Sequence, residues 1–248
     1  MSKHNIFRSR ITELEISAGT AVERLLLREY GSVFVSQGVI RPPYIVFPDE
    51  ESVTSFQSIA EVSSAAIGGL EFTLQQNAMA ALLTAAEEAL SYDLSISPRG
   101  PESGSRTYSE TVALWASRVD PALEHWLEEG RISAGTAQRI RIASPFEQVP
   151  IVLELENDGI FFAKDLSKSI IYSVAPPGSS QHLSMLAFDV AEFGQPDVRS
   201  LLGRHGWFQT VTSDLPHFTY LGAAESELPE LGLKRVENAG RTFWVPDI

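Results

Sequence analysis

Two histidine-containing segments in the second half of the chain carry residue types that bind metal ions. His182 and Asp189 lie in PGSSQHLSMLAFDV, and Asp214 and His217 lie in SDLPHFTY. Two imidazoles and a carboxylate are a three-ligand set that can hold zinc and leave a fourth position for water. A second carboxylate could serve as general base to that water. Residue types alone favour a plainer interpretation, in which both histidines bond to the backbone and the aspartates cap turns.

The surrounding letters resemble the motifs of zinc-dependent D-alanyl-D-alanine carboxypeptidases and related peptidoglycan peptidases, the hedgehog/DD-peptidase fold group. The first motif is Ser-x-His, four residues, Ala-x-Asp, and residues 180–189 match it, with Pro-Gly ahead. The second is an acid, two residues and His-Phe-x-Tyr, matched by residues 214–220. A third segment, SGSRTYSE at residues 103–110, is similar to the family's Ser-Gly-x-Arg-x-Tyr-x-Glu. Three motifs in the family's order are more specific than any one of them.

The resemblance implies that zinc is the cofactor and that His182, Asp189 and His217 are its ligands. Zinc would activate a water molecule for attack on a peptide bond. His₂Asp ligation suits zinc best, although iron, cobalt and manganese also occupy such sites.

The same resemblance implies roles for three further side chains. Asp214 takes the place of the family's general base, Arg106 lies near the scissile carbonyl, and Ser180 helps to hold the substrate backbone. Zinc and the Arg106 guanidinium would together stabilise the developing oxyanion.

Four positions bear on how far the resemblance extends. Asp214 is one methylene shorter than the usual glutamate, and Met185 stands where the family often has glycine. Thr111 stands where a glutamine often follows the arginine segment, and Arg99 competes with Arg106 for the arginine role. Arg106 is preferred because its neighbours match the motif.

Composition excludes several other kinds of site and partner. The chain has 248 residues, a formal net charge of -13 and no cysteine. A surface this acidic repels phosphate backbones, so we expect no nucleic-acid partner. Without cysteine there is neither a disulfide nor a thiolate zinc site. No run approaches the length of a membrane span, and the first 17 residues contain no apolar core of signal-peptide length.

The expected helices and strands are interspersed without a regular βαβ order. This favours an α+β fold with a small antiparallel sheet flanked by helices. Helices are expected at residues 20–30, 74–90, 108–119, 121–130 and 197–204. Strands are expected at 31–36, 92–97, 149–163 (as a hairpin), 169–175 and 217–222. ISAGTA occurs at residues 16–21 and 132–137, each time before a helical run, which we interpret as reused capping chemistry.

Residues 1–58 carry no chemical motif and are expected to form an N-terminal extension that packs on a catalytic domain at 59–248. The expected function is a zinc peptidase acting on D-amino-acid peptides such as peptidoglycan stem peptides. One alternative is a catalytically inactive, zinc-containing binding module of the same fold. Another is a hydrolase whose substrate is not cell wall, such as an intracellular dipeptide. A cell-wall substrate would imply the periplasm or cell envelope, but the sequence itself assigns no compartment.

Overall fold

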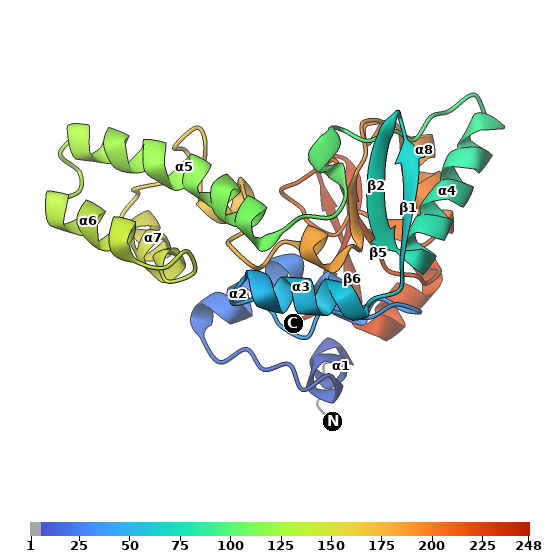
Figure 1. Cartoon of the computed structure of the whole chain (residues 1–248), viewed down its shortest axis with the longest axis horizontal. Coiled ribbons are helices and arrows are strands. Elements are labelled where there is room, and N and C mark those ends of the chain that lie inside the picture. The colour runs from blue at the N-terminus through green and yellow to red at the C-terminus, as the bar shows by residue number, and fades with distance from the viewer. Residues whose placement is uncertain (1–5) are drawn as a thin grey trace.

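The structure of the protein is a computed structural model that describes residues 6–248. It has an α+β fold in which helices surround three small antiparallel sheets (Figure 1). The helices are α1 (Ile6–Glu13), α2 (Ala21–Tyr30), α3 (Glu50–Ile59), α4 (Gln76–Leu90), α5 (Tyr108–Glu128), α6 (Ala134–Ile142), α7 (Gln148–Asn157) and α8 (Pro196–Arg204). The strands are β1 (Val62–Ile67), β2 (Leu70–Gln75), β3 (Ala187–Asp189), β4 (Trp207–Phe208), β5 (His217–Tyr220), β6 (Leu233–Asn238) and β7 (Arg241–Pro246). None of the helices in residues 6–248 combines the length and hydropathy that a membrane crossing requires.

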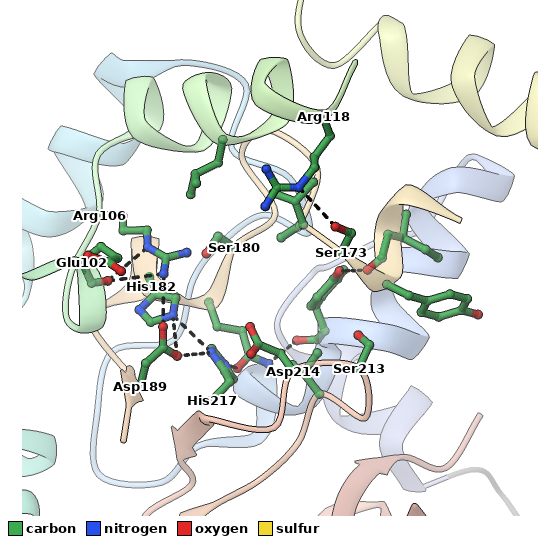
Figure 2. A pocket seen from close by; sticks show the side chains of 18 of the residues that line it. Glu102, Arg106, Arg118, Ser173, Ser180, His182, Asp189, Ser213, Asp214 and His217 are labelled. Atoms are coloured by element: carbon green, nitrogen blue, oxygen red, sulfur yellow. Dashed lines mark hydrogen bonds and ion pairs between the residues drawn. The ribbon is translucent and has the colours of Figure 1, made fainter. Parts of the chain in front are cut away.

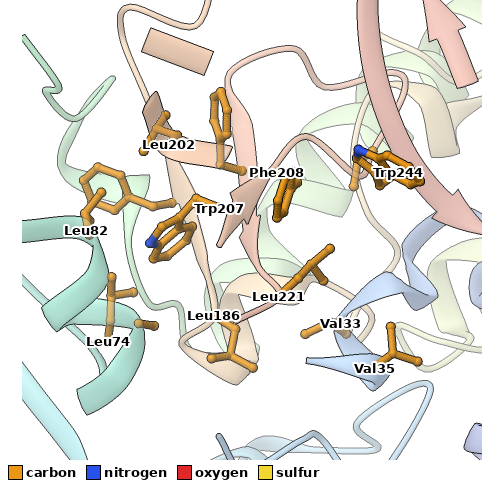
Figure 3. Packing of buried hydrophobic residues seen from close by; sticks show 14 of the residues in the cluster. Val33, Val35, Leu74, Leu82, Leu186, Leu202, Trp207, Phe208, Leu221 and Trp244 are labelled. Atoms are coloured by element: carbon orange, nitrogen blue, oxygen red, sulfur yellow. The ribbon is translucent and has the colours of Figure 1, made fainter. Parts of the chain in front are cut away.

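The three-stranded sheet, in the order β3-β5-β4, lies within the main hydrophobic core. Trp207 is fully buried there, and leucines from α4, α8 and the strand ends belong to the same cluster (Figure 3). Phe72 of the β1–β2 hairpin packs edge-on against Phe188 of β3. The sheet is therefore held by close packing on several sides.

The N-terminal section shares this core. Phe7 of α1 and Leu26 of α2 belong to the same hydrophobic cluster as the central sheet. A Cβ at Gly232 would come within 2.4 Å of the Phe7 backbone nitrogen, so α1 approaches the start of β6 as closely as glycine allows. The Gln37 N–H donates to the carbonyl of Leu221 just beyond β5. Residues 1–5 of the expected extension lie outside the described residues.

Helices α5, α6 and α7 form a second unit with its own hydrophobic cluster, on one side of the molecule in Figure 1. The expected helix break at Pro121 is wrong, because α5 runs without interruption from Tyr108 to Glu128. Pro121 lies on the exposed face, while Trp115, Val119 and Leu123 on the opposite face pack into the cluster. This packing outweighs the one backbone hydrogen bond that proline removes.

The expected hairpin at residues 149–163 is also wrong. Residues 148–157 form α7, whose Val149 and Val152 are buried one helical turn apart, with Glu156 one turn further on. A helix places these three on one face, whereas a strand would turn adjacent β-branched residues to opposite faces. Tertiary packing thus overrides the β propensity of the valines and isoleucine.

Three further segments expected as strands are not strands. Residues 31–35 and 170–172 form short 3₁₀ helices, and residues 92–97 are a turn and an irregular extended segment. All five residues of the first are buried, including Ser32, whose hydroxyl donates to the carbonyl of Trp244. The expected helices at 20–30 and 197–204 and the strand starting at His217 are confirmed within one or two residues. Helix α4 begins two residues later than expected, because Leu74 and Gln75 end β2.

Candidate metal centre

The pairing of β3 with β5 positions two of the three expected metal ligands. In this antiparallel register Asp189 lies directly opposite His217. His182 comes from the 3₁₀ turn Gln181–Ser184 that leads into β3, and its ring meets that of His217 edge-on, 4.9 Å between centroids. The three side chains converge in Figure 2. All three are at least nine-tenths buried.

One nitrogen of each imidazole faces the Asp189 carboxylate. His182 Nε2 lies 3.4 Å from Asp189 Oδ1, and His217 Nδ1 lies 3.3 Å from the same oxygen. The two nitrogens are 3.1 Å apart. One nitrogen of each ring and one carboxylate oxygen thus form a compact triangle that could hold a metal ion.

The hydrogen bonds on the outer side of each ring decide which nitrogen carries the proton. His182 Nδ1 lies 2.6 Å from the carbonyl oxygen of Gly104, which only accepts, so Nδ1 is the donor. His217 Nε2 lies 2.8 Å from Gln181 Oε1. The Gln181 amide is oriented by its own Nε2–H, which donates to the Tyr30 carbonyl at 2.7 Å, so Oε1 is the atom that accepts from His217. Both inner nitrogens therefore present lone pairs, as metal-binding histidines with such outer partners do.

The triangle contains three acceptors and no donor. Asp189 Oδ1 is buried and has no hydrogen-bond partner among the described residues. Buried polar atoms are nearly always satisfied, and an exception requires a physical cause. A cation at the centre would satisfy all three atoms at once, so the donor set fits a metal ion.

The protonation states also suit metal binding. Burial lowers the pKa of His182, and the nearby Arg106 adds to that effect, which keeps the imidazole neutral. Burial acts to raise the pKa of Asp189, but the proximity of the His182 and His217 rings outweighs burial and holds the pKa below its usual value. A carboxylate and neutral imidazoles are the forms that bind metals.

The other expected site residues line the same pocket as the triangle. The pocket has a volume of about 480 Å³ and is also lined by Arg106, Ser180 and Asp214. Arg106 Nη2 lies 3.3 Å from Asp189 Oδ2, the oxygen on the outer side of the carboxylate. Asp214 is exposed, and the Ser180 hydroxyl faces the pocket in Figure 2. The structure thus brings all six expected site residues together, including Asp189, His182 and His217.

The other three positions that bear on the resemblance, Met185, Thr111 and Arg99, have clear places. Met185 is buried, with a φ of 57°, a backbone conformation that favours glycine, and it does not line the pocket. Thr111 is also buried, and its hydroxyl accepts from the Gly178 N–H at 3.2 Å. Arg99 lines the pocket, but its contact with Asp189 is through the backbone, while Arg106 reaches the carboxylate.

Sequence reasoning missed the groups that orient the ligands. Gln181 is adjacent to His182 in the first motif, and Gly104 precedes Arg106 by two residues in the third. Their position inside the motifs is a signal, but their role needs the fold, because Gly104 acts through its carbonyl. Arg118 and Lys164 also line the pocket and were not foreseen. Arg118 lies four residues after Leu114 on the same face of α5, but only the structure shows that this face lines the pocket.

Comparison of the chain with protein-family models, with curated proteins and with solved structures produced no match. The resemblance to the zinc D-alanyl-D-alanine carboxypeptidases therefore stays a prediction from three short motifs.

Proposed function

We propose that the protein is a zinc-dependent peptidase that hydrolyses peptides containing D-amino acids, such as the stem peptides of peptidoglycan. The observation that carries the proposal is the triangle of His182, Asp189 and His217, with three unprotonated ligand atoms on the wall of a pocket. The D-amino-acid substrate class comes from the motif resemblance.

Zinc suits this donor set on two grounds. Two imidazoles and one carboxylate are a known catalytic zinc set that leaves one position open. Ligand atoms at zinc distances of about 2.0–2.2 Å in a tetrahedral arrangement lie about 3.3–3.6 Å apart. The observed separations of 3.1, 3.3 and 3.4 Å are close to that range.

Bound zinc would supply Lewis acidity and lower the pKa of water, so that a nucleophile is available at neutral pH. The Asp214 carboxylate, exposed in the same pocket, accepts the proton of the attacking water and passes it to the departing amine. The Arg106 guanidinium stabilises negative charge on the carbonyl oxygen. The Ser180 hydroxyl is available for a hydrogen bond to the substrate backbone.

Metal analysis combined with a peptide-hydrolysis assay tests the proposal. We expect about one zinc per chain in the wild type and loss of both zinc and hydrolysis in His182→Ala and His217→Ala. Asp214→Asn should keep its zinc and lose about 10²–10⁴-fold in rate, because it removes only the general base. His205→Ala is the matched control, since His205 bonds to Glu88 and does not line the pocket.

The outcomes separate the two candidate functions. Hydrolysis that survives both ligand substitutions would exclude the metallopeptidase. Bound zinc in a wild type that hydrolyses no D-Ala-D-Ala or stem peptide would instead support the catalytically inactive binding module.

A further inference from the structure

The wall of the pocket that faces away from the metal ligands comes from the helical unit. Leu114 and Arg118 of α5 and Lys164 from the loop after α7 line it, together with Tyr172 and Ser173. Arg118 reaches over the pocket from α5 in Figure 2, with Ser180 between it and the metal ligands. Two cationic side chains thus stand on the wall that carries no metal ligand.

The Arg118 guanidinium is held in place by neutral hydroxyl groups. Its Nε donates to Ser173 Oγ at 3.2 Å, and its Nη1 donates to Ser117 Oγ at 2.8 Å. Both partners are neutral hydroxyls, and across residues 6–248 no Asp or Glu side chain forms an ion pair with Arg118. Arg106, at the other end of the pocket, is paired with Asp189.

This contrast separates Arg118 from Arg106 by function. The chain carries 32 acidic and 19 Lys or Arg residues, so acidic partners are plentiful. A guanidinium that is anchored by hydroxyls and left unpaired in a pocket is prepared for an external anion. Its planar fork matches a carboxylate through two parallel hydrogen bonds. Lys164 adds a second positive charge to the same wall.

We propose that Arg118 is a specificity-determining residue that binds a free carboxylate of the substrate. The proposal rests on the proposed peptidase function for the identity of the substrate as a peptide. The carboxylate has two possible sources, which are the C-terminus of the peptide and an acidic side chain. A terminal carboxylate would make the enzyme a carboxypeptidase, and a side-chain carboxylate would fit cleavage within an acidic peptide.

The test is a binding titration of the metal-free protein, followed by NMR, with three peptides. Acetyl-D-Ala-D-Ala carries a terminal carboxylate, acetyl-D-Glu-D-Ala amide carries only a side-chain carboxylate, and acetyl-D-Ala-D-Ala amide carries neither. We expect one of the two acids to bind about tenfold more tightly than the neutral amide in the wild type. That preference should vanish in Arg118→Ala and Arg118→Gln, while affinity for the neutral amide stays unchanged.

Arg139→Ala is the matched control, because Arg139 pairs with Glu154 on the exposed surface and does not line the pocket. It should retain the full preference. Whichever acid loses its advantage in the Arg118 variants identifies the source of the carboxylate. No preference in the wild type, or a preference that survives both Arg118 substitutions, would overturn the proposal.

Hydrolysis by the zinc-loaded protein is measured separately, so the two failures are distinguishable. A carboxylate preference without hydrolysis leaves the role of Arg118 standing and refutes the peptidase. Hydrolysis without a carboxylate preference refutes only the role of Arg118.

Discussion

Substitution of Asp189 by asparagine should change the stability of the metal-free and the metal-loaded protein in opposite directions. In the metal-free protein Asp189 Oδ1 faces the lone pairs of His182 Nε2 and His217 Nδ1 at 3.4 and 3.3 Å, with no proton among the three atoms. An asparagine amide in the same place would donate its two hydrogens to the two imidazoles. Its oxygen, turned outward, would still accept from Arg106 Nη2, which lies 3.3 Å from Asp189 Oδ2. Asp189→Asn should therefore stabilise the metal-free protein.

The size of the effect follows from the contacts. Two new hydrogen bonds contribute about 0.5–1.5 kcal/mol each, so we expect a gain of about 2 kcal/mol. For a chain of this length that gain raises Tm by about 4–8 °C. Metal binding should instead raise the free energy of unfolding of the wild type, by about 4.1 kcal/mol when the free ion is at 1,000 times Kd. The substitution should abolish most of this gain, because it removes the only anionic ligand.

Thermal unfolding of EDTA-treated protein, with and without added zinc, measures both the metal-free stability and the stabilisation by zinc. We would work at about pH 8, above the usual imidazole pKa of about 6.5. Asp214→Asn is the control, because it removes a carboxylate from the same pocket without touching the triangle. It should change neither the metal-free Tm nor the zinc-dependent shift.

A metal-free Asp189→Asn protein that is less stable than the wild type would refute the assignment of lone pairs to both inner nitrogens, since at least one of them would then carry a proton. A full zinc-dependent shift in the same variant would refute the role of Asp189 as a ligand.

Three further predictions concern the metal site and the fold around it. Gln181→Ala should weaken zinc binding about 10–100-fold in a competition titration while zinc remains detectable, because it frees His217 from its outer partner. Glu156→Gln should keep the hydrogen bonds from the Phe162 and Ile170 N–H groups and flatten the pH dependence of the free energy of unfolding. Burial raises the pKa of Glu156 from 4.5, so the wild type loses stability as the pH rises above that value through the folded-state pKa. An unchanged pH profile in the variant would count against this. Gly178→Ala should lower the free energy of unfolding by more than about 2 kcal/mol in urea, because φ is +77° and a Cβ would lie 2.1 Å from the Phe47 carbonyl oxygen, and a near-neutral result would contradict that backbone conformation.

The α+β class could be predicted from the pattern of the sequence, and the six candidate site positions came from the motif resemblance. Helix α2 follows its apolar spacing and begins after Thr20, whose side chain forms a capping box with Glu23. The candidate metal ligands stand out because histidine and aspartate are placed in short motifs. Helix α7 could not be predicted, because its valines and isoleucine favour a strand locally and become helical only by packing against α5 and α6.

The hexapeptide ISAGTA shows the same limit at the scale of a few residues. In its first copy Thr20 is the N-cap and α2 begins at the next residue. In its second copy the N-cap is Ser133, so α6 begins three residues earlier in the motif. Identical letters supply two capping hydroxyls, and the surrounding packing selects which of them is used.

By itself the sequence determined the chemical inventory: an acidic chain without cysteine, with two imidazoles and carboxylates in short motifs. Only the tertiary structure decided how these groups are used. The register of β3 and β5 sets Asp189 opposite His217, and the carbonyl of Gly104 and the amide of Gln181 turn both lone pairs inward. The same fold places Arg118 of α5 on another wall of the pocket. The physical reason is that a lone pair's direction depends on partners distant in the chain, and only folding brings those partners within hydrogen-bond reach.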